Sequence, residues 1–107
     1  MRNNQPITQV ETLLPQGQFI YSRTDLHGTI VEANEAFAQI SGYRREEMLG
    51  QPHNMVRHPD MPEQAFQDMW RDLKQGRPWR GLVKNRRQDG GFYWVEAYVT
   101  PLFRHKE

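Results

Sequence analysis

Residues 51–62 read Gln-Pro-His-Asn-Met-Val-Arg-His-Pro-Asp-Met-Pro, and they divide the chain into two differently patterned halves. The prolines fix their own φ angles and restrict the residue before each of them, so this segment is predicted to be stiff and irregular. It also carries two histidines and an arginine, a mixture that no packed helix or strand needs. It is therefore predicted to form the wall of a binding site. The alternative is a proline-rich surface crossing with solvated charges.

The residues before this segment predict a hairpin followed by a helix. Residues 19–23 and 29–33 are rich in β-branched and aromatic types, and the Asp and Gly between them favour a tight connection. Asn34 stands at the N-cap position of the helix, whose apolar face carries Ala36, Phe37 and Ile40. Ser41-Gly42 is expected to end the helix, and residues 44–49 to form a polar turn.

The residues after the segment predict a longer helix and two strands. Asp60 can cap the helix with Glu63 as its capping-box partner, and Gly76 is expected to end it. Its apolar face is Ala65, Phe66, Met69, Trp70 and Leu73. Residues 79–87 and 92–103 are predicted strands, joined by a turn that contains Gly90-Gly91.

This order of elements predicts an α+β fold in which an antiparallel sheet carries short helices on one face. The helices must cross from one edge of the sheet to the other, which leaves a concave pocket between them and the sheet. Residues 1–17 are predicted to be an N-terminal cap or arm, and residues 18–107 to be one domain.

Composition excludes several function classes. The chain has 14 Lys and Arg against 13 Asp and Glu, so its net charge of +1 implies no bulk attraction to nucleic acid or to an anionic membrane. It has no cysteine, which excludes disulfides and thiolate metal sites. No apolar run approaches the roughly 20 residues that span a bilayer. A cytoplasmic location is expected, and no nucleophile–base pair or acid dyad points to an enzyme.

Alternation along the last two strands predicts the pocket lining. The inward residues are predicted to be Trp79, Gly81, Val83, Asn85 and Arg87 on one strand, and Tyr93, Val95, Ala97 and Val99 on the other. The small residues leave space bordered by Trp79, Tyr93 and Trp70, which suits a flat aromatic ligand. The aromatic side chains could instead fill the core themselves.

Asn85 is the polar group on this wall. A buried unpaired amide costs roughly 1–3 kcal/mol, so Asn85 needs a partner. A ligand that presents both a donor and an acceptor would satisfy it, as would neighbouring backbone. On the outer face, Leu82, Trp94 and Tyr98 form an apolar patch that is typical of an interface.

Several motifs together resemble a PAS domain: Asn34-Glu35-Ala36-Phe37, Ser41-Gly42-Tyr43, Leu49-Gly50-Gln51-Pro52, Asn85 to Gly90, and Tyr93-Trp94-Val95. Residues 51–62, Asp68-Met69-Trp70 and Val83 to Arg87 are similar to the N-terminal PAS domain of bacterial aerotaxis receptors. The resemblance covers about residues 20 to 103. It implies a non-covalently bound FAD, redox sensing, and a signal passed to a HAMP domain and a chemotaxis signalling domain, in a receptor anchored in the inner membrane.

The resemblance also implies site residues. Asn34, Arg57, His58 and Asp60 match positions associated with FAD binding, and Asn85 matches a flavin-reading asparagine of light-sensing PAS domains. Arg57 suits phosphate oxygens, and His53 and His58 can donate to phosphate, ribose or flavin oxygens. Asp60 would hold Arg57 or His58, or cap the next helix.

Two other functions stay open. In a haem-binding gas sensor, His53 or His58 would be the axial ligand. A cofactor-free PAS interaction module would bind neither group. A cysteinyl photoreceptor is excluded because the chain has no cysteine. The outer patch is expected to contact the signalling domain, and a homodimer or an exchange of strands is possible.

PAS sheets resemble one another in having a fifth, central strand between the first and the fourth. The chain ends where the loop to that strand would begin, so two central edges are expected to be unpaired. The N-terminal arm or a second molecule is expected to complete the sheet; otherwise FAD binding should be poor.

Overall fold

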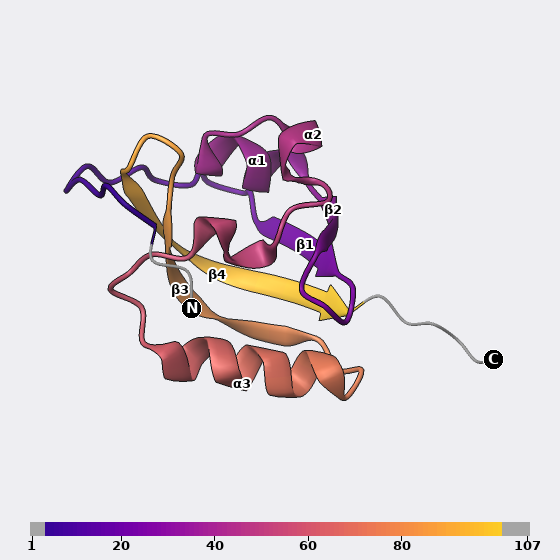
Figure 1. The fold of residues 1–107 in the computed structure, drawn as a ribbon. Helices are drawn as coiled ribbons and strands as arrows, with labels where there is room; N and C mark the ends of the chain where they lie inside the picture. The colour runs from indigo at the N-terminus through magenta and orange to yellow at the C-terminus, as the bar shows by residue number, and fades with distance from the viewer. Residues whose placement is uncertain (1–3, 102–107) are drawn as a thin grey trace.

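A computed structural model of the chain describes residues 4–101, in which four strands form one sheet and helices cover one of its faces (Figure 1). The elements in chain order are β1 Ile20–Thr24, β2 Ile30–Ala33, α1 Glu35–Ser41, α2 Arg45–Met48, the 3-10 helix η1 His53–Val56, α3 Glu63–Lys74, β3 Trp79–Arg86 and β4 Phe92–Pro101. This arrangement confirms the predicted α+β fold with helices on one face.

The strands are ordered β2-β1-β4-β3, and the central pair differs from the prediction. Strands β1 and β4 run parallel to each other, with Ile20 opposite Ala97 and Thr24 opposite Pro101, whereas the other two pairs are antiparallel. The sheet is therefore mixed. The prediction that two central strand edges are unpaired is wrong for the described residues, because β1 and β4 hydrogen-bond directly to each other. Neither the N-terminal arm nor a second molecule is needed between these two strands.

The predicted turn between β1 and β2 and the predicted start and end of α1 are confirmed. Asp25 Oδ1 accepts hydrogen bonds from the amides of His27 and Thr29, which closes the hairpin turn. Asn34 Oδ1 accepts from the amide of Phe37, so Asn34 is the N-cap of α1. Gly42 ends α1 with a φ of 80°, in the left-handed region that favours glycine.

Two local predictions are wrong. The predicted polar turn contains the one-turn helix α2, because the amide of Arg44 is capped by the side chain of Glu47 three residues later. Asp60 does not cap α3: that helix begins after Pro62 with no side-chain cap. The Asp60 carboxylate instead lies 3.2 Å from Lys84 Nζ on β3.

The core lies between the sheet and the helices. Tyr93, Val95, Ala97 and Val99 of β4 are all buried, as the alternation predicts. On β3, Val83 and Asn85 are buried, Trp79 is half-buried, and Leu82 on the opposite face is 67% exposed. Trp94 is exposed on that opposite face of β4, whereas Tyr98 is half-buried.

Residues 50–57, which we call the strap, connect the two outer edges of the sheet. At one end, the amide of Ile30 donates to Gln51 O and the amide of His53 to Gly28 O, so the strap extends the sheet beyond β2. At the other end, Arg57 forms an antiparallel bridge with Asn85 of β3. The strap therefore carries η1 across the helical face of the sheet.

The segment before β1 packs against the hairpin between β3 and β4. The amide of Thr8 donates to Gly90 O, and Glu11 forms a parallel bridge with Phe92. These contacts place the predicted arm at the hairpin, away from the β1–β4 seam.

Asn34 joins β1 to α1 as well as capping the helix, since its Oδ1 also accepts from the Tyr21 amide and its Nδ2 donates to Phe19 O. Asn34→Ala should lower the free energy of unfolding by about 2 kcal/mol, because the helix loses its cap and the strand loses two bonds. Asn34→Asp keeps the acceptor and should lose less. Urea unfolding of the ligand-free chain measures both, and equal stability of Asn34→Ala and the parent chain would contradict this role.

Candidate functional site

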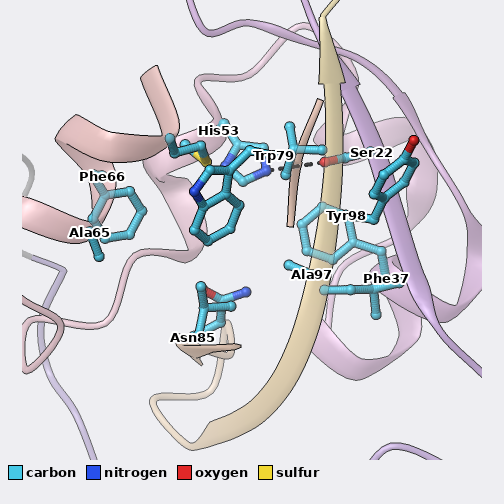
Figure 2. Close-up of a pocket in the computed structure, with 13 residues that line it drawn as sticks. Ser22, Phe37, His53, Ala65, Phe66, Trp79, Asn85, Ala97 and Tyr98 are labelled. Carbon is cyan, nitrogen blue, oxygen red and sulfur yellow. Dashed lines mark hydrogen bonds between the residues drawn. The ribbon is translucent and has the colours of Figure 1, made fainter. Parts of the chain in front are cut away.

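A cavity lies between the helical face of the sheet and the helices η1 and α3 (Figure 2). Most of its lining is apolar or aromatic, with polar groups from three elements. The lining residues are Ile20, Ser22, Phe37, His53, Ala65, Phe66, Met69, Trp79, Val83, Asn85, Ala97, Tyr98 and Val99. An apolar cavity with a few convergent polar groups has the character of a small-molecule site.

Trp79 fills most of the space in this cavity. Its indole folds back over Gly81, where a Cβ atom would lie 2.5 Å from the ring. The remaining free volume is about 20 Å³, roughly enough for one water molecule. The predicted space above Gly81 and Ala97 therefore exists in the fold, but the chain's own indole occupies it. A flat ring system could enter only if Trp79 moved.

His53 presents an unsatisfied polar atom in this cavity wall. Its ring is 8% exposed, and Nε2 lies 3.1 Å from the hydroxyl of Ser22 on β1 (Figure 2). Nδ1 is buried and has no hydrogen-bond partner among the described residues. Burial lowers the pKa of His53 to about 4, so the ring is neutral near pH 7. A neutral imidazole with one nitrogen still available is suited to a polar atom on a ligand.

Asn85 lies on the opposite side of the cavity and already has a protein partner. Its Nδ2 donates to the hydroxyl of Tyr93 at 3.2 Å, and that hydroxyl also contacts the Ser41 hydroxyl. Burial raises the pKa of Tyr93, so the phenol stays protonated. Tyr93 thus lies in the core behind Asn85 instead of lining the cavity.

Arg57 is turned into the protein rather than towards solvent. Its side chain is 7% exposed; Nη2 donates to Met61 O at 3.0 Å, and the guanidinium carbon lies 5.6 Å from the centre of the Phe66 ring. Phe66 itself lines the cavity. Arg57 therefore holds the end of the strap against a side chain of the cavity lining.

His58 and Asp60 lie together next to β3. His58 is buried, its Nδ1 accepts from the amide of Asp60, and the Asp60 carboxylate lies 3.9 Å from that nitrogen. Burial, and then the nearby cation of Lys84, lowers the pKa of His58, while Asp60 opposes this effect. Neither residue lines the cavity.

Of the nine predicted site residues, the structure brings His53, Trp79 and Asn85 together at the cavity. Trp70 lies elsewhere, packed on Gly28 beside Leu26 and His27. The Asn34 side chain is used by neighbouring backbone.

Sequence reasoning missed seven lining residues. Tyr98 was predicted on the outer face alone, and the others are Ile20, Ser22, Phe37, Ala65, Phe66 and Met69. Ser22 could have been found, since it shares the inward face of β1 with Ile20 and Thr24. The two phenylalanines lie on predicted apolar helix faces, which do not distinguish a core residue from a cavity lining.

Comparison with known proteins assigns the chain to a protein family. The PAS fold family matches residues 30–107, and the chain belongs to that family. The sequence is 52% identical over 104 residues to the aerotaxis receptor of Escherichia coli strain K12, which confirms the predicted resemblance. That alignment covers 97% of this chain and 21% of the receptor, so the chain spans about a fifth of this curated relative.

Solved structures agree with this class. A PAS domain from Colwellia psychrerythraea has a TM-score of 0.64 and 28% identity, covering 76% of this chain and 69% of that one. A light-oxygen-voltage domain studied with a flavin analogue has a TM-score of 0.56 and 27% identity, covering 62% of this chain and 49% of that one.

Within residues 4–101, no helix is both long and apolar enough to cross a membrane. The same residues contain no cluster of three or more His, Asp or Glu side chains that could hold a metal ion.

The buried, neutral state of His53 makes folding pH-dependent. As the pH falls below about 6.5, the unfolded chain takes up a proton that the folded His53, with a pKa of about 4, does not. The free energy of unfolding should therefore decrease from pH 6.5 towards pH 4, with a contribution from His53 of about 2 kcal/mol at about pH 5.

Urea unfolding of the parent chain and of His53→Gln, measured at neutral and mildly acidic pH, tests this expectation. The variant cannot titrate at this position and should lose less stability on acidification. His58, whose pKa is also lowered, is retained in both proteins and contributes equally. An identical pH dependence in the two proteins would contradict the assignment.

Proposed function

We propose that this chain is a redox-sensing PAS domain that binds FAD non-covalently, with the flavin ring in the cavity between His53 and Asn85. The buried Nδ1 of His53, which has no partner within the described part of the chain, is the observation that carries this proposal. The apolar and aromatic lining suits a flat ring, and Asn85 offers an amide on the opposite side. The identity with the aerotaxis receptor supports the same function.

A bound flavin would supply a ring system whose charge and hydrogen bonding change on reduction. Within the protein, His53 would present a neutral nitrogen to the ring edge, held in orientation by Ser22. Asn85 would exchange its bond to Tyr93 for one to the ligand, while Tyr93 keeps its contact with Ser41. Trp79 would leave the space over Gly81 and cover the ring.

The residues of the proline-rich wall support the site indirectly. Arg57, the strongest cation of the wall, contacts Met61 O and Phe66, and His58 and Asp60 contact each other and β3. These contacts favour a role in shaping the wall around the ligand. Asn34, by its contacts, would act through β1 and α1, and Trp70 through α3.

A sensor must also transmit a conformational change from the ligand site to a surface that contacts its partner. Asn85 is paired with Tyr93 across β3 and β4, and the neighbouring pair, Lys84 and Trp94, includes an aromatic ring on the outer face. A rearrangement at Asn85 would thus displace the patch formed by Leu82, Trp94 and Tyr98. A ligand biases two conformations only through such differential contacts. We place the signalling domain of a membrane-anchored receptor against this patch, on the cytoplasmic side.

Reconstitution with FAD tests the proposal. The purified chain should show the two-banded flavin spectrum, and denaturation should release FAD, identified by chromatography. Binding should also change the tryptophan fluorescence in the parent chain more than in Trp79→Phe, because the indole is expected to move. A chain that stays colourless and shows no fluorescence change with excess FAD would overturn the proposal.

A cofactor-free interaction module is the second candidate. The bond between Asn85 and Tyr93 and the filling of the cavity by Trp79 both favour it, since each satisfies inside the protein a group that a ligand would otherwise satisfy. The same spectrum distinguishes the two functions. A Soret band would instead indicate haem, for which His53 is the histidine at the cavity.

Asn85→Ala provides a second, more specific prediction. If the amide contacts the flavin ring, the variant should bind FAD about tenfold more weakly or show a shifted midpoint potential, because one polar partner is lost. Gln88→Ala, which removes an exposed amide just beyond the same strand, is the control. Titration and potentiometry of both variants measure the effect, and unchanged values for Asn85→Ala would support an asparagine that bonds only to protein.

A further inference from the structure

The first described residue of the N-terminal arm reaches the strap. Asn4 is 8% exposed, and its Nδ2 lies 2.7 Å from Arg57 O, 3.1 Å from Asn54 O and 3.2 Å from Met55 O. One side-chain amide therefore points at three carbonyl oxygens of a single short segment, about fifty positions away in the sequence.

These carbonyls lie at the end of η1, where a side-chain donor has most effect. The C-cap amide of Arg57 donates to Asn54 O, and η1 is otherwise a single turn with little stability of its own. Asn4 thus caps the C-terminal end of η1 from outside. Because His53 is the first residue of η1, the cap fixes the turn that presents His53 to the cavity.

The rest of the N-terminal arm is hydrogen-bonded to β3 and β4, so the position of Asn4 is supported by its neighbours in the chain. Arg86 Nε donates to Pro6 O at 2.9 Å, and the amide of Phe92 donates to Val10 O. Gly91 leaves room for this approach, since a Cβ there would lie 2.7 Å from Val10 O. The arm therefore links the hairpin between β3 and β4 to the strap.

We propose that Asn4 is a positioning residue that clamps η1, so that the N-terminal arm controls both the order of the strap and the rate at which a ligand leaves the cavity. Asn4 does not line the cavity and acts only through η1. The statement on ligand release rests on the proposed function, whereas the statement on the order of the strap does not.

Amide hydrogen exchange tests the clamp without any ligand. The amides of Met55 and Arg57, which donate to Pro52 O and Asn54 O, should exchange about tenfold faster in Asn4→Ala than in the parent chain, as expected when one buried polar contact is lost. Asn4→Asp should be affected at least as strongly, because a carboxylate would face three carbonyl oxygens. Gln16→Ala, which removes an exposed amide of the same arm, should have no effect.

The amides of Val95 and Ala97 in the central strand β4 report on the whole fold and should exchange as in the parent chain. Unchanged exchange at Met55 and Arg57 in Asn4→Ala would overturn the clamp, as would a uniform increase at all four positions. FAD release is then followed by stopped flow, and Asn4→Ala should lose FAD about tenfold faster, about 1.4 kcal/mol.

The two proposals fail separately. If the parent chain binds no FAD, the proposed function fails, and exchange alone decides the clamp. If the parent chain binds FAD and Asn4→Ala releases it at the parent rate, the control of release by Asn4 is wrong while the proposed function stands.

Discussion

The strap sets the shape of this molecule, because it is bonded to both outer strands of one sheet. Pro52 bridges to Thr29 beside β2, and Arg57 bridges to Asn85 of β3. Five peptide steps reach about 18 Å at most, whereas a flat sheet of this order would separate the two bridging points by five spacings of about 4.8 Å, roughly 24 Å. The sheet must therefore curve around the strap. That curvature makes the helical face concave, and the cavity with its polar groups follows from it.

Local signals in the sequence predicted most of the fold. The Asp25 turn, the Asn34 cap, the left-handed Gly42 and the alternation along β4 depend on near neighbours, and each is confirmed. Two predictions were wrong because contacts between residues distant in the sequence replaced the local ones, and hydrophobic periodicity does not reveal such contacts. Asp60 bonds to Lys84, a residue distant in sequence, instead of capping α3, and β1 pairs with β4 directly. Strand pairing between distant segments depends on the whole chain, so no local pattern specifies it.

The candidate site was predictable only in part, for a related reason. Strand alternation predicted that Trp79 and Asn85 face a pocket, and the proline-rich segment that carries His53 was predicted to form a wall of the site. The structure brings the three residues together. The direction of Arg57 could not be predicted, because it depends on Met61 O and Phe66, which the irregular strap brings near. A buried cation that bonds to backbone and one that faces a ligand look identical in sequence. The role of Asn4 could not be predicted either, because its partners are backbone carbonyl groups, which every residue has and which leave no pattern in the sequence.

The position of Trp79 also has a thermodynamic consequence. Its indole and any ring-shaped ligand require the same volume over Gly81, so the side chain acts as a tethered competitor whose local concentration never changes. If the indole occupied the space 99% of the time, the apparent dissociation constant would be about 100 times the intrinsic one. Contacts that stabilise or destabilise the inward rotamer of one tryptophan would then tune the affinity of the whole domain, without altering any atom that touches the ligand.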